Sequence, residues 1–237
     1  MVIERPRNDP AQYDDLLAQW WAPRGAFAML HWISAARARL VPRASHPAAL
    51  LVDLACGGGL MAPYAGRLGY RHLGLDLSAG SLRIAAGHGV VPVRADVGRL
   101  PLASAVADVV VAGEVLEHVE DAAGVLAEAV RVLRPGGTLV LDTIADTWWG
   151  RFSSITVAER MPGGPPPRLH DGRLFVDRER LVAQCAGLGV DLTLSGLRLC
   201  ATDYAAWLVG RRPDVRMLTT RSTAGLFQAH GAKRVHP

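Results

Sequence analysis

The chain has 237 residues, 50% of them hydrophobic, which is enough for one hydrophobic core and a small additional segment. Its formal net charge is +4, and the positive residues are scattered arginines apart from Lys233, so no nucleic-acid-binding surface is expected. The cysteines lack the spacing of metal ligands and are expected as free thiols: Cys56, Cys185 and Cys200. The N-terminus is charged, and no apolar run reaches the roughly 18 residues of a membrane span. We therefore expect a cytoplasmic protein with at most a peripheral membrane contact.

Residues 1–49 are predicted to form a helical cap. Apolar residues recur every three to four positions in segments 12–21 and 26–41, which is typical of amphipathic helices. The pattern then changes to an alternation of apolar strands and helical segments. We therefore place a second domain at 50–237.

Strands that are apolar throughout and separated by helices indicate a parallel sheet covered on both faces. Right-handed crossovers then give a doubly wound α/β fold, here with a mostly parallel sheet of seven strands. The strands are expected at 49–55, 72–78, 90–97, 107–113, 137–144, 190–197 and 224–232. The helices between them are expected at 60–69, 79–89, 121–137 and 178–189, the third ending at Pro135-Gly136-Gly137. No element is predicted for residues 198–222.

Residues 145–175 interrupt this alternation with two tryptophans and a Pro/Gly-rich hinge. A long insertion beside the strand ends is often a lid or a wall of the substrate site, although a plain surface excursion is the alternative. Its candidate site residues are an apolar group, Trp148, Trp149 and Met161, and a polar pair, His170 and Asp171. Ordinary packing of the insertion is the alternative for the apolar group, and a polar loop pair with no role is the alternative for His170 and Asp171.

A glycine-rich turn, Val-Asp-Leu-Ala-Cys-Gly-Gly-Gly at 52–59, follows the first strand of the second domain. Glycine permits positive φ and the close approach of a ligand, and the following helix offers free amide groups. The turn matches neither the dinucleotide pattern G-x-G-x-x-G nor a P-loop. Asp76 ends the next strand, where a carboxylate can accept hydrogen bonds from both ribose hydroxyls of an adenosyl ligand. Asp96 ends the third strand, where it can meet the adenine amino group.

Four segments, 52–59, 74–78, 94–121 and 128–143, together resemble the successive motifs of class I S-adenosylmethionine-dependent methyltransferases. The resemblance implies their fold, the cofactor S-adenosylmethionine and a methyl-transfer reaction. Transfer from a sulfonium needs no thiol nucleophile, so the cysteine of the glycine turn is expected to be a small packed residue. The candidate cofactor-binding residues in this region are Asp53, Ala55, Cys56, Gly57, Gly59, Asp76, Leu77, Asp96, Val97 and Gly113.

The segment before this region is similar to the O-methyltransferases of ubiquinone biosynthesis. The matching residues are Trp20, Trp21, Leu30, His31, Ile33 and Arg37. The resemblance implies that Arg37 holds the methionine carboxylate of the cofactor, a charge-assisted contact that suits arginine. It also implies a small phenolic acceptor, a catechol or hydroquinol, which is lipophilic where it carries a polyprenyl tail. Two positions depart from the family: Ala55 stands where glycine is usual, and Gly113 where a larger side chain often flanks the adenosyl group.

Two other classes share the cofactor motifs. A methyltransferase acting on carbon or nitrogen of another small metabolite would carry the same glycine turn and the same acids. A non-catalytic module that binds S-adenosyl ligands would carry them too.

Glu114, Glu117 and His118 follow the fourth predicted strand, at positions i, i+3 and i+4, so they project to one side if the stretch is helical. Three interpretations stay open. The family resemblance implies a Mg²⁺ site, which would hold a catechol and lower the pKa of its hydroxyl, although histidine is an unusual ligand for this ion. Alternatively, His118 is a general base that takes the phenolic proton. In the third interpretation Glu114 contacts the cofactor and His118 only orders the loop.

Overall fold

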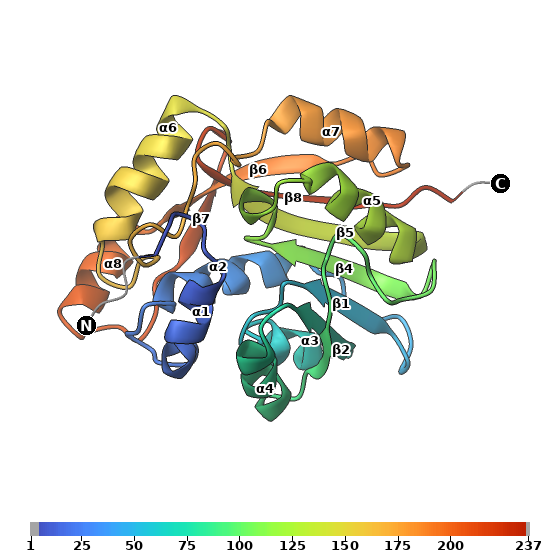
Figure 1. The fold of residues 1–237 in the computed structure, drawn as a ribbon, viewed down its shortest axis with the longest axis horizontal. Helices are drawn as coiled ribbons and strands as arrows, with labels where there is room; N and C mark the ends of the chain where they lie inside the picture. The colour runs from blue at the N-terminus through green and yellow to red at the C-terminus, as the bar shows by residue number, and fades with distance from the viewer. Residues whose placement is uncertain (1–4, 236–237) are drawn as a thin grey trace.

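The computed structural model describes residues 5–235 and shows an eight-stranded sheet with helices on both faces (Figure 1). The strand order is β3-β2-β1-β4-β5-β8-β6-β7. The five strands from β3 to β5 are parallel to one another, whereas β8, β6 and β7 pair in antiparallel fashion. The strands are β1 (Leu50–Leu54), β2 (Arg71–Asp76), β3 (Val91–Arg94), β4 (Ala107–Gly113), β5 (Leu133–Ile144), β6 (Thr193–Leu199), β7 (Met217–Thr220) and β8 (Leu226–Ala232).

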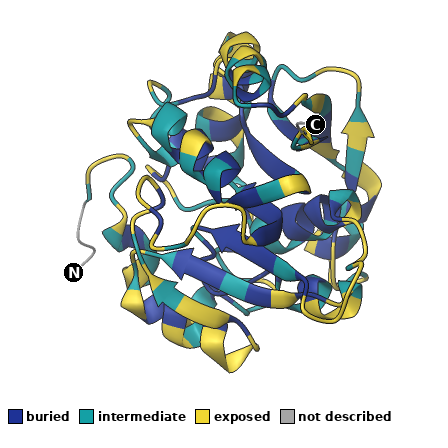
Figure 2. Cartoon of the chain, turned by 90° about the vertical axis from the view of Figure 1, so that its right-hand side faces the viewer, coloured by how far each residue is buried: buried dark blue, intermediate teal, exposed yellow. Residues whose placement is uncertain are grey.

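The central strands β1 and β4 are buried along almost their whole length, as Figure 2 shows for the middle of the molecule. Both are runs of leucine, valine and alanine interrupted by one aspartate each, because helices cover the sheet on both faces and leave no polar side. β3 lies at the edge and is mostly exposed. The predicted doubly wound fold is confirmed in this half of the sheet.

Two groups of helices cover the two faces. On one face, Leu126 of α5 and Leu181 of α7 pack against β4 and β8. On the other face, Ala65 of α3 and Ala38, just after α2, pack against Leu51 of β1. The helices are α1 (Ala11–Asp15), α2 (Ala28–Arg37), α3 (Ala62–Leu68), α4 (Ala79–Gly87), α5 (Ala122–Val132), α6 (Trp148–Arg151), α7 (Arg178–Gly187) and α8 (Ala201–Leu208). None of the helices within residues 5–235 combines the length and the apolar character needed to cross a bilayer.

The prediction of seven strands was wrong by one. The eighth strand, β7, lies in residues 198–222, for which no element was predicted, together with α8. β7 has four residues and pairs only with β6 at the sheet edge, so it needs little apolar sequence and leaves a weak signal. The third predicted helix is also shorter than expected: α5 ends at Val132, and Leu133 already has the extended backbone of β5.

Segments from both ends of the chain meet at the carboxyl ends of the parallel strands. The N-terminal helices α1 and α2 lie there, on the same side of the molecule as α6 and α8 (Figure 1). Residues 145–175 contain α6 and two further turns of helix, η4 (Phe152–Val157) and η5 (Ala158–Arg160). The boundary that we predict between a 1–49 cap and a 50–237 domain stays a prediction.

Candidate active site

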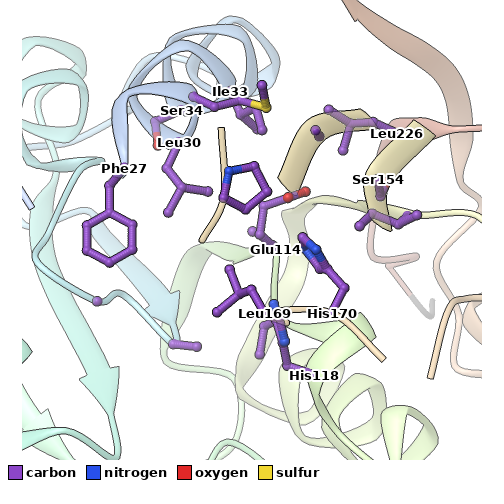
Figure 3. A pocket seen from close by; sticks show the side chains of 18 of the residues that line it. Phe27, Leu30, Ile33, Ser34, Glu114, His118, Ser154, Leu169, His170 and Leu226 are labelled. Atoms are coloured by element: carbon purple, nitrogen blue, oxygen red, sulfur yellow. The ribbon is translucent and has the colours of Figure 1, made fainter. Parts of the chain in front are cut away.

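A cavity of about 620 Å³ opens at the carboxyl ends of β1, β2 and β4, within the size range of small-molecule sites. Its walls come from the N-terminal helices, these strand ends, the segment after β5, and strands β6 and β7. Figure 3 shows side chains of α2 on one side, the apolar Leu30 and Ile33 with the polar Ser34, and opposite them the polar side chains Glu114, His118 and His170.

Two features of the glycine turn were not predicted: the positive φ of Ala55, and the contact of two of the glycines with Trp20. Ala55, which stands where the family usually has glycine, has φ +52°, in the left-handed region that favours glycine, so the alanine costs backbone strain. A Cβ on Gly57 would lie 2.3 Å from the Trp20 indole, and one on Gly58 would lie 2.6 Å from it. These glycines therefore admit the Trp20 ring, while Ala55, Cys56 and Gly57 still line the cavity.

Gly59 does not line the cavity. Its φ is +80°, and a Cβ there would meet Ala85 of α4 and Val90 at 3.0 Å. The absence of a side chain at Gly59 lets the turn pack against α4, outside the cavity lining. Cys56 is buried, and burial raises the pKa of its thiol, in agreement with a packed, unreactive residue.

Asp76 is held by the glycine turn. Its Oδ2 accepts a hydrogen bond from the Gly57 amide at 2.9 Å, and its Oδ1 accepts one from the Ser78 amide at 2.8 Å. Each carboxylate oxygen keeps a second lone pair, so the group can still accept two hydroxyls. Burial raises the pKa of Asp76 despite these amide contacts. Leu77 beside it is 55% exposed and lines the cavity, where it offers an apolar surface.

The other predicted contacts divide into two groups. Asp53 lines the cavity with one carboxylate oxygen fixed by the buried His72 ring at 3.1 Å, and Val97 lines it too. Asp96 is exposed and does not line the cavity, and its Oδ1 accepts a hydrogen bond from the Gly98 amide. Asp96 is therefore, with Gly59, a predicted cofactor contact that does not line the cavity.

Arg37 forms a buried ion pair with Asp142 of β5. Its Nε and Nη2 donate to the two carboxylate oxygens at 2.5 and 2.6 Å. Burial lowers the pKa of Arg37, but Asp142 outweighs burial and the net shift is upward. A Cβ on Gly113 would lie 1.9 Å from Arg37 Cζ, so the guanidinium occupies the space of the larger side chain expected at this position. Within residues 5–235, Nη1 has no hydrogen-bond partner and Arg37 lines the cavity.

Glu114 and Glu117 are placed differently. Glu114 lines the cavity with φ +50°, and its buried Oε1 has no partner within the described chain. Glu117 is fully buried behind the cavity wall, where Oε2 accepts a hydrogen bond from Thr143 Oγ1 at 2.6 Å. Burial and neighbouring acids raise the pKa of Glu114, and burial raises the pKa of Glu117 to about 7. Both carboxyls therefore bind protons more tightly than usual.

The predicted metal set does not fit a metal. The stretch forms a short 3-10 turn, η3 (Leu116–His118), so its three side chains do not project together. Glu117 faces Thr143 outside the cavity, and both ring nitrogens of His118 already contact neighbours. Across residues 5–235, no three histidine, cysteine or acidic side chains are arranged to hold one ion. The Mg²⁺ interpretation is therefore not supported.

His118 projects into the cavity between residues from distant segments. Its Nδ1 lies 2.6 Å from Asn8 Oδ1, and its Nε2 lies 3.5 Å from the Tyr13 hydroxyl. The His170 ring stacks on it with centroids 5.5 Å apart. Burial, with a smaller effect of His170, lowers the pKa of His118 to about 3, so the imidazole is neutral at physiological pH.

Sequence reasoning missed Asn8 and Tyr13, and it was partly right about the 145–175 segment. Trp149, Met161 and His170 line the cavity as anticipated. Trp148 does not; it is 73% exposed and stacks on Phe152. Asp171 pairs with Arg173 on the surface. The only early signal for Tyr13 was the apolar periodicity of its helix.

Comparison with known proteins identifies the family. Residues 52–141 match the family model described as "Methyltransferase domain". A ubiquinone biosynthesis O-methyltransferase from Caulobacter vibrioides is 31% identical over 76% of this chain and 79% of the relative. The chain is a class I S-adenosylmethionine-dependent methyltransferase. Another protein of the same name, from a Methylobacterium species, is 34% identical over 73% of this methyltransferase and 78% of the relative.

Solved structures confirm the fold of the methyltransferase. A S-adenosylmethionine-dependent methyltransferase from Thermotoga maritima aligns over 94% of this chain and 97% of its own, with a TM-score of 0.65 at 18% identity. The [4+2]-cyclase SpnF aligns over 100% and 99%, with a TM-score of 0.60 at 17% identity. Both matches cover more of the chain than the central sheet, so the similarity of fold is not limited to the strands and helices of the cofactor motifs.

Replacing Gly113 by alanine should displace the Arg37 guanidinium and break its pair with Asp142. Loss of one partner of a buried ion pair costs about 3–5 kcal/mol, so we expect a drop of that order in the free energy of unfolding, measured by urea denaturation. Gly66→Ala is the matched control, because a Cβ there meets nothing within 4 Å. A Gly113→Ala protein as stable as wild type would contradict the packing of Arg37 on this glycine.

Glu117 should make the stability of the methyltransferase depend on pH. Its folded pKa of about 7 lies above the ordinary value of 4.5, so the folded state binds more protons between these values and stability falls as pH rises through them. Glu117→Gln should remove this fall, which is on the order of a few kcal/mol. Thermal unfolding from pH 4.5 to 8 measures it, with the exposed Glu120→Gln as control. Parallel profiles for wild type and Glu117→Gln would rule the effect out.

Proposed function

We propose that this methyltransferase methylates an oxygen of a small phenolic acceptor of the catechol or hydroquinol type. The observation that carries the proposal is a neutral histidine, His118, whose Nε2 contacts a phenolic hydroxyl, that of Tyr13, inside the cavity. A nitrogen that accepts from one phenol is placed to accept from another. The curated relatives, named ubiquinone biosynthesis O-methyltransferases, support the same class of acceptor.

Three groups are proposed to hold S-adenosylmethionine. The free lone pairs of Asp76 accept the ribose hydroxyls, and Leu77 supports the adenine ring. Nη1 of Arg37 donates to the methionine carboxylate, while Asp142 keeps the guanidinium in place. The cavity includes all three residues and the glycine turn between them.

Bound S-adenosylmethionine supplies a methyl group on an electrophilic sulfonium. The chain has to align the acceptor oxygen with that methyl group and to remove the hydroxyl proton. As the O–CH₃ bond forms and the S–CH₃ electron pair goes to sulfur, the hydroxyl proton moves to His118 Nε2. The cavity loses the sulfonium charge and gains an imidazolium charge in the same step. His118 can therefore accept a proton in spite of its burial, because the net charge of the cavity stays constant.

The rest of the cavity wall suits an aromatic, lipophilic acceptor. Beyond His118 it is lined by apolar side chains from α2, the 145–175 segment and the antiparallel strands: Met29, Ile33, Val157, Met161, Leu197, Met217 and Leu226. Such a wall binds an aromatic ring or an alkyl substituent by burial of apolar surface.

Amine methylation is a second candidate, favoured by Glu114. Its carboxyl lines the cavity and has an unpartnered oxygen, which could bind the ammonium group of an amine acceptor. The first assay below separates the two reactions, since the position of the new methyl group identifies the nucleophile.

The first assay follows S-adenosylhomocysteine release with a panel of catechols, hydroquinols and primary amines, and NMR locates the new methyl group. We expect methylation of a phenolic oxygen, and unchanged turnover in excess chelator because Glu114, Glu117 and His118 do not form a metal site. His118→Gln should lower kcat by about 10²–10⁴-fold, the usual contribution of general acid–base catalysis.

Activity that chelator abolishes and Mg²⁺ restores would overturn the metal-free mechanism. Methylation confined to amines would replace the first candidate by the second. Binding of S-adenosylmethionine without turnover on any acceptor would favour a non-catalytic ligand-binding module.

Asp76→Ala should weaken S-adenosylhomocysteine binding by about 1–3 kcal/mol, the range for lost hydrogen bonds to a charged group. Calorimetry on the purified protein measures the affinity. Asp14→Ala is the control, because Asp14 carries the same charge near Asp76 and does not line the cavity; its carboxylate accepts a hydrogen bond from the Ser78 hydroxyl. An unchanged affinity in Asp76→Ala would remove Asp76 from the cofactor site.

A further inference from the structure

Asn8 contacts His118 through two hydrogen bonds. Its side-chain Nδ2 donates to the His118 carbonyl oxygen at 3.0 Å, and its Oδ1 lies 2.6 Å from His118 Nδ1. The two residues are 110 positions apart in the sequence. The contact therefore joins the N-terminal segment to the turn that follows β4.

The hydrogen bond to the His118 carbonyl determines which atom donates and which accepts in the hydrogen bond between Asn8 and the His118 ring. A backbone carbonyl only accepts, so the amide end that faces it must be the NH₂ group, and the other end must be the carbonyl oxygen. That oxygen also only accepts, so Nδ1 of His118 must carry the proton. In a neutral imidazole the remaining nitrogen, Nε2, then has a free lone pair.

That lone pair points to the Tyr13 hydroxyl. Burial, with the nearby Glu117, Glu114 and Asp76, raises the pKa of Tyr13, so the group stays a protonated phenol and can donate. At 3.5 Å the contact is at the long limit of a hydrogen bond and is easily exchanged for a shorter one.

The backbone explains why an asparagine suits position 8. Asn8 has φ +59°, a conformation that asparagine adopts more readily than most residues. Its amide N–H donates to the Arg168 carbonyl, and the Gln12 side chain donates to the same carbonyl and to that of Pro6. The N-terminal segment is thus fastened to the 145–175 segment independently of His118.

We propose that Asn8 is a positioning residue that holds His118 as the Nδ1–H tautomer, so that Nε2 presents its lone pair to the acceptor hydroxyl. The N-terminal segment is then part of the catalytic apparatus, because the base has the required tautomer only when this segment is docked. The catalytic consequence rests on the proposed function; the tautomer itself does not.

Long-range ¹H–¹⁵N NMR of protein labelled with ¹⁵N-histidine tests the tautomer without any acceptor, and His118→Gln assigns the His118 signals. We expect a protonated Nδ1 and a bare Nε2 in wild type. Asn8→Ala should shift His118 toward the other tautomer, while Asn8→Asp keeps the acceptor oxygen and should keep the Nδ1–H form. Gln12→Ala is the matched control, since it loosens the same segment without touching His118.

Kinetics on the best acceptor complete the test. Asn8→Ala should lower kcat about 10-fold or more while leaving the KM for S-adenosylmethionine unchanged, and Asn8→Asp should restore most of kcat. A wild-type His118 protonated at Nε2 would overturn the proposal, whether or not the variants fold. So would an Asn8→Ala protein with an unchanged tautomer or unchanged kcat, or a Gln12→Ala protein that shifts the tautomer equally. If no phenol is methylated, the proposed function fails, and the catalytic part of this inference fails with it, while the NMR result still decides the tautomer.

Discussion

The buried ion pair between Arg37 and Asp142 joins the N-terminal helices to the sheet at the place where the cavity begins. A guanidinium at this depth is tolerated only with a partner, and a carboxylate inside β5 equally so. The bidentate contact satisfies both groups and fixes the end of α2 over the strand ends. Gly113 is part of the same arrangement, because only a residue without a side chain leaves room for the guanidinium.

One arginine among several buried acids has electrostatic consequences. Asp53, Glu114 and Asp142 all act on Arg37, and burial, with the neighbouring carboxyls of Glu117 and Asp142, raises the pKa of Glu114. The cavity wall thus carries more acidic than basic groups next to the predicted cofactor site. Such a wall favours a cationic ligand, and the sulfonium of the methyl donor is a cation. The strained φ of Glu114 belongs to the same place, where a strand end turns its carboxyl toward the cavity instead of toward solvent.

The sequence predicted those features that depend on residues close to one another along the chain. Continuous apolar strands identified the parallel half of the sheet, and strand-end acids identified Asp76 at the cavity. It could not reveal the partner of Arg37, because Asp142 is one acid within an apolar strand and only the fold brings it to α2. Asn8 was hidden for the same reason, since nothing near it in sequence relates it to His118. Asp96 shows another limit: it was predicted to end the third strand, but β3 already ends at Arg94, and the exposed side chain of Asp96 does not line the cavity.

The cavity wall is polar at one end and mostly apolar at the other, and the place where the two parts meet indicates where methyl transfer would occur. At the ends of β1 and β2 the wall carries the carboxylates of Asp53 and Asp76 and the glycine turn, whereas between α2, β6 and β7 it is mostly apolar. Glu114 and His118 lie near the boundary, on the turn after β4 (Figure 3). A charged donor is held best on the polar side and an aromatic acceptor on the apolar side, so the methyl group would cross at this boundary. His118 lies at this boundary, and its contact with Asn8 directs the lone pair of Nε2 toward a hydroxyl.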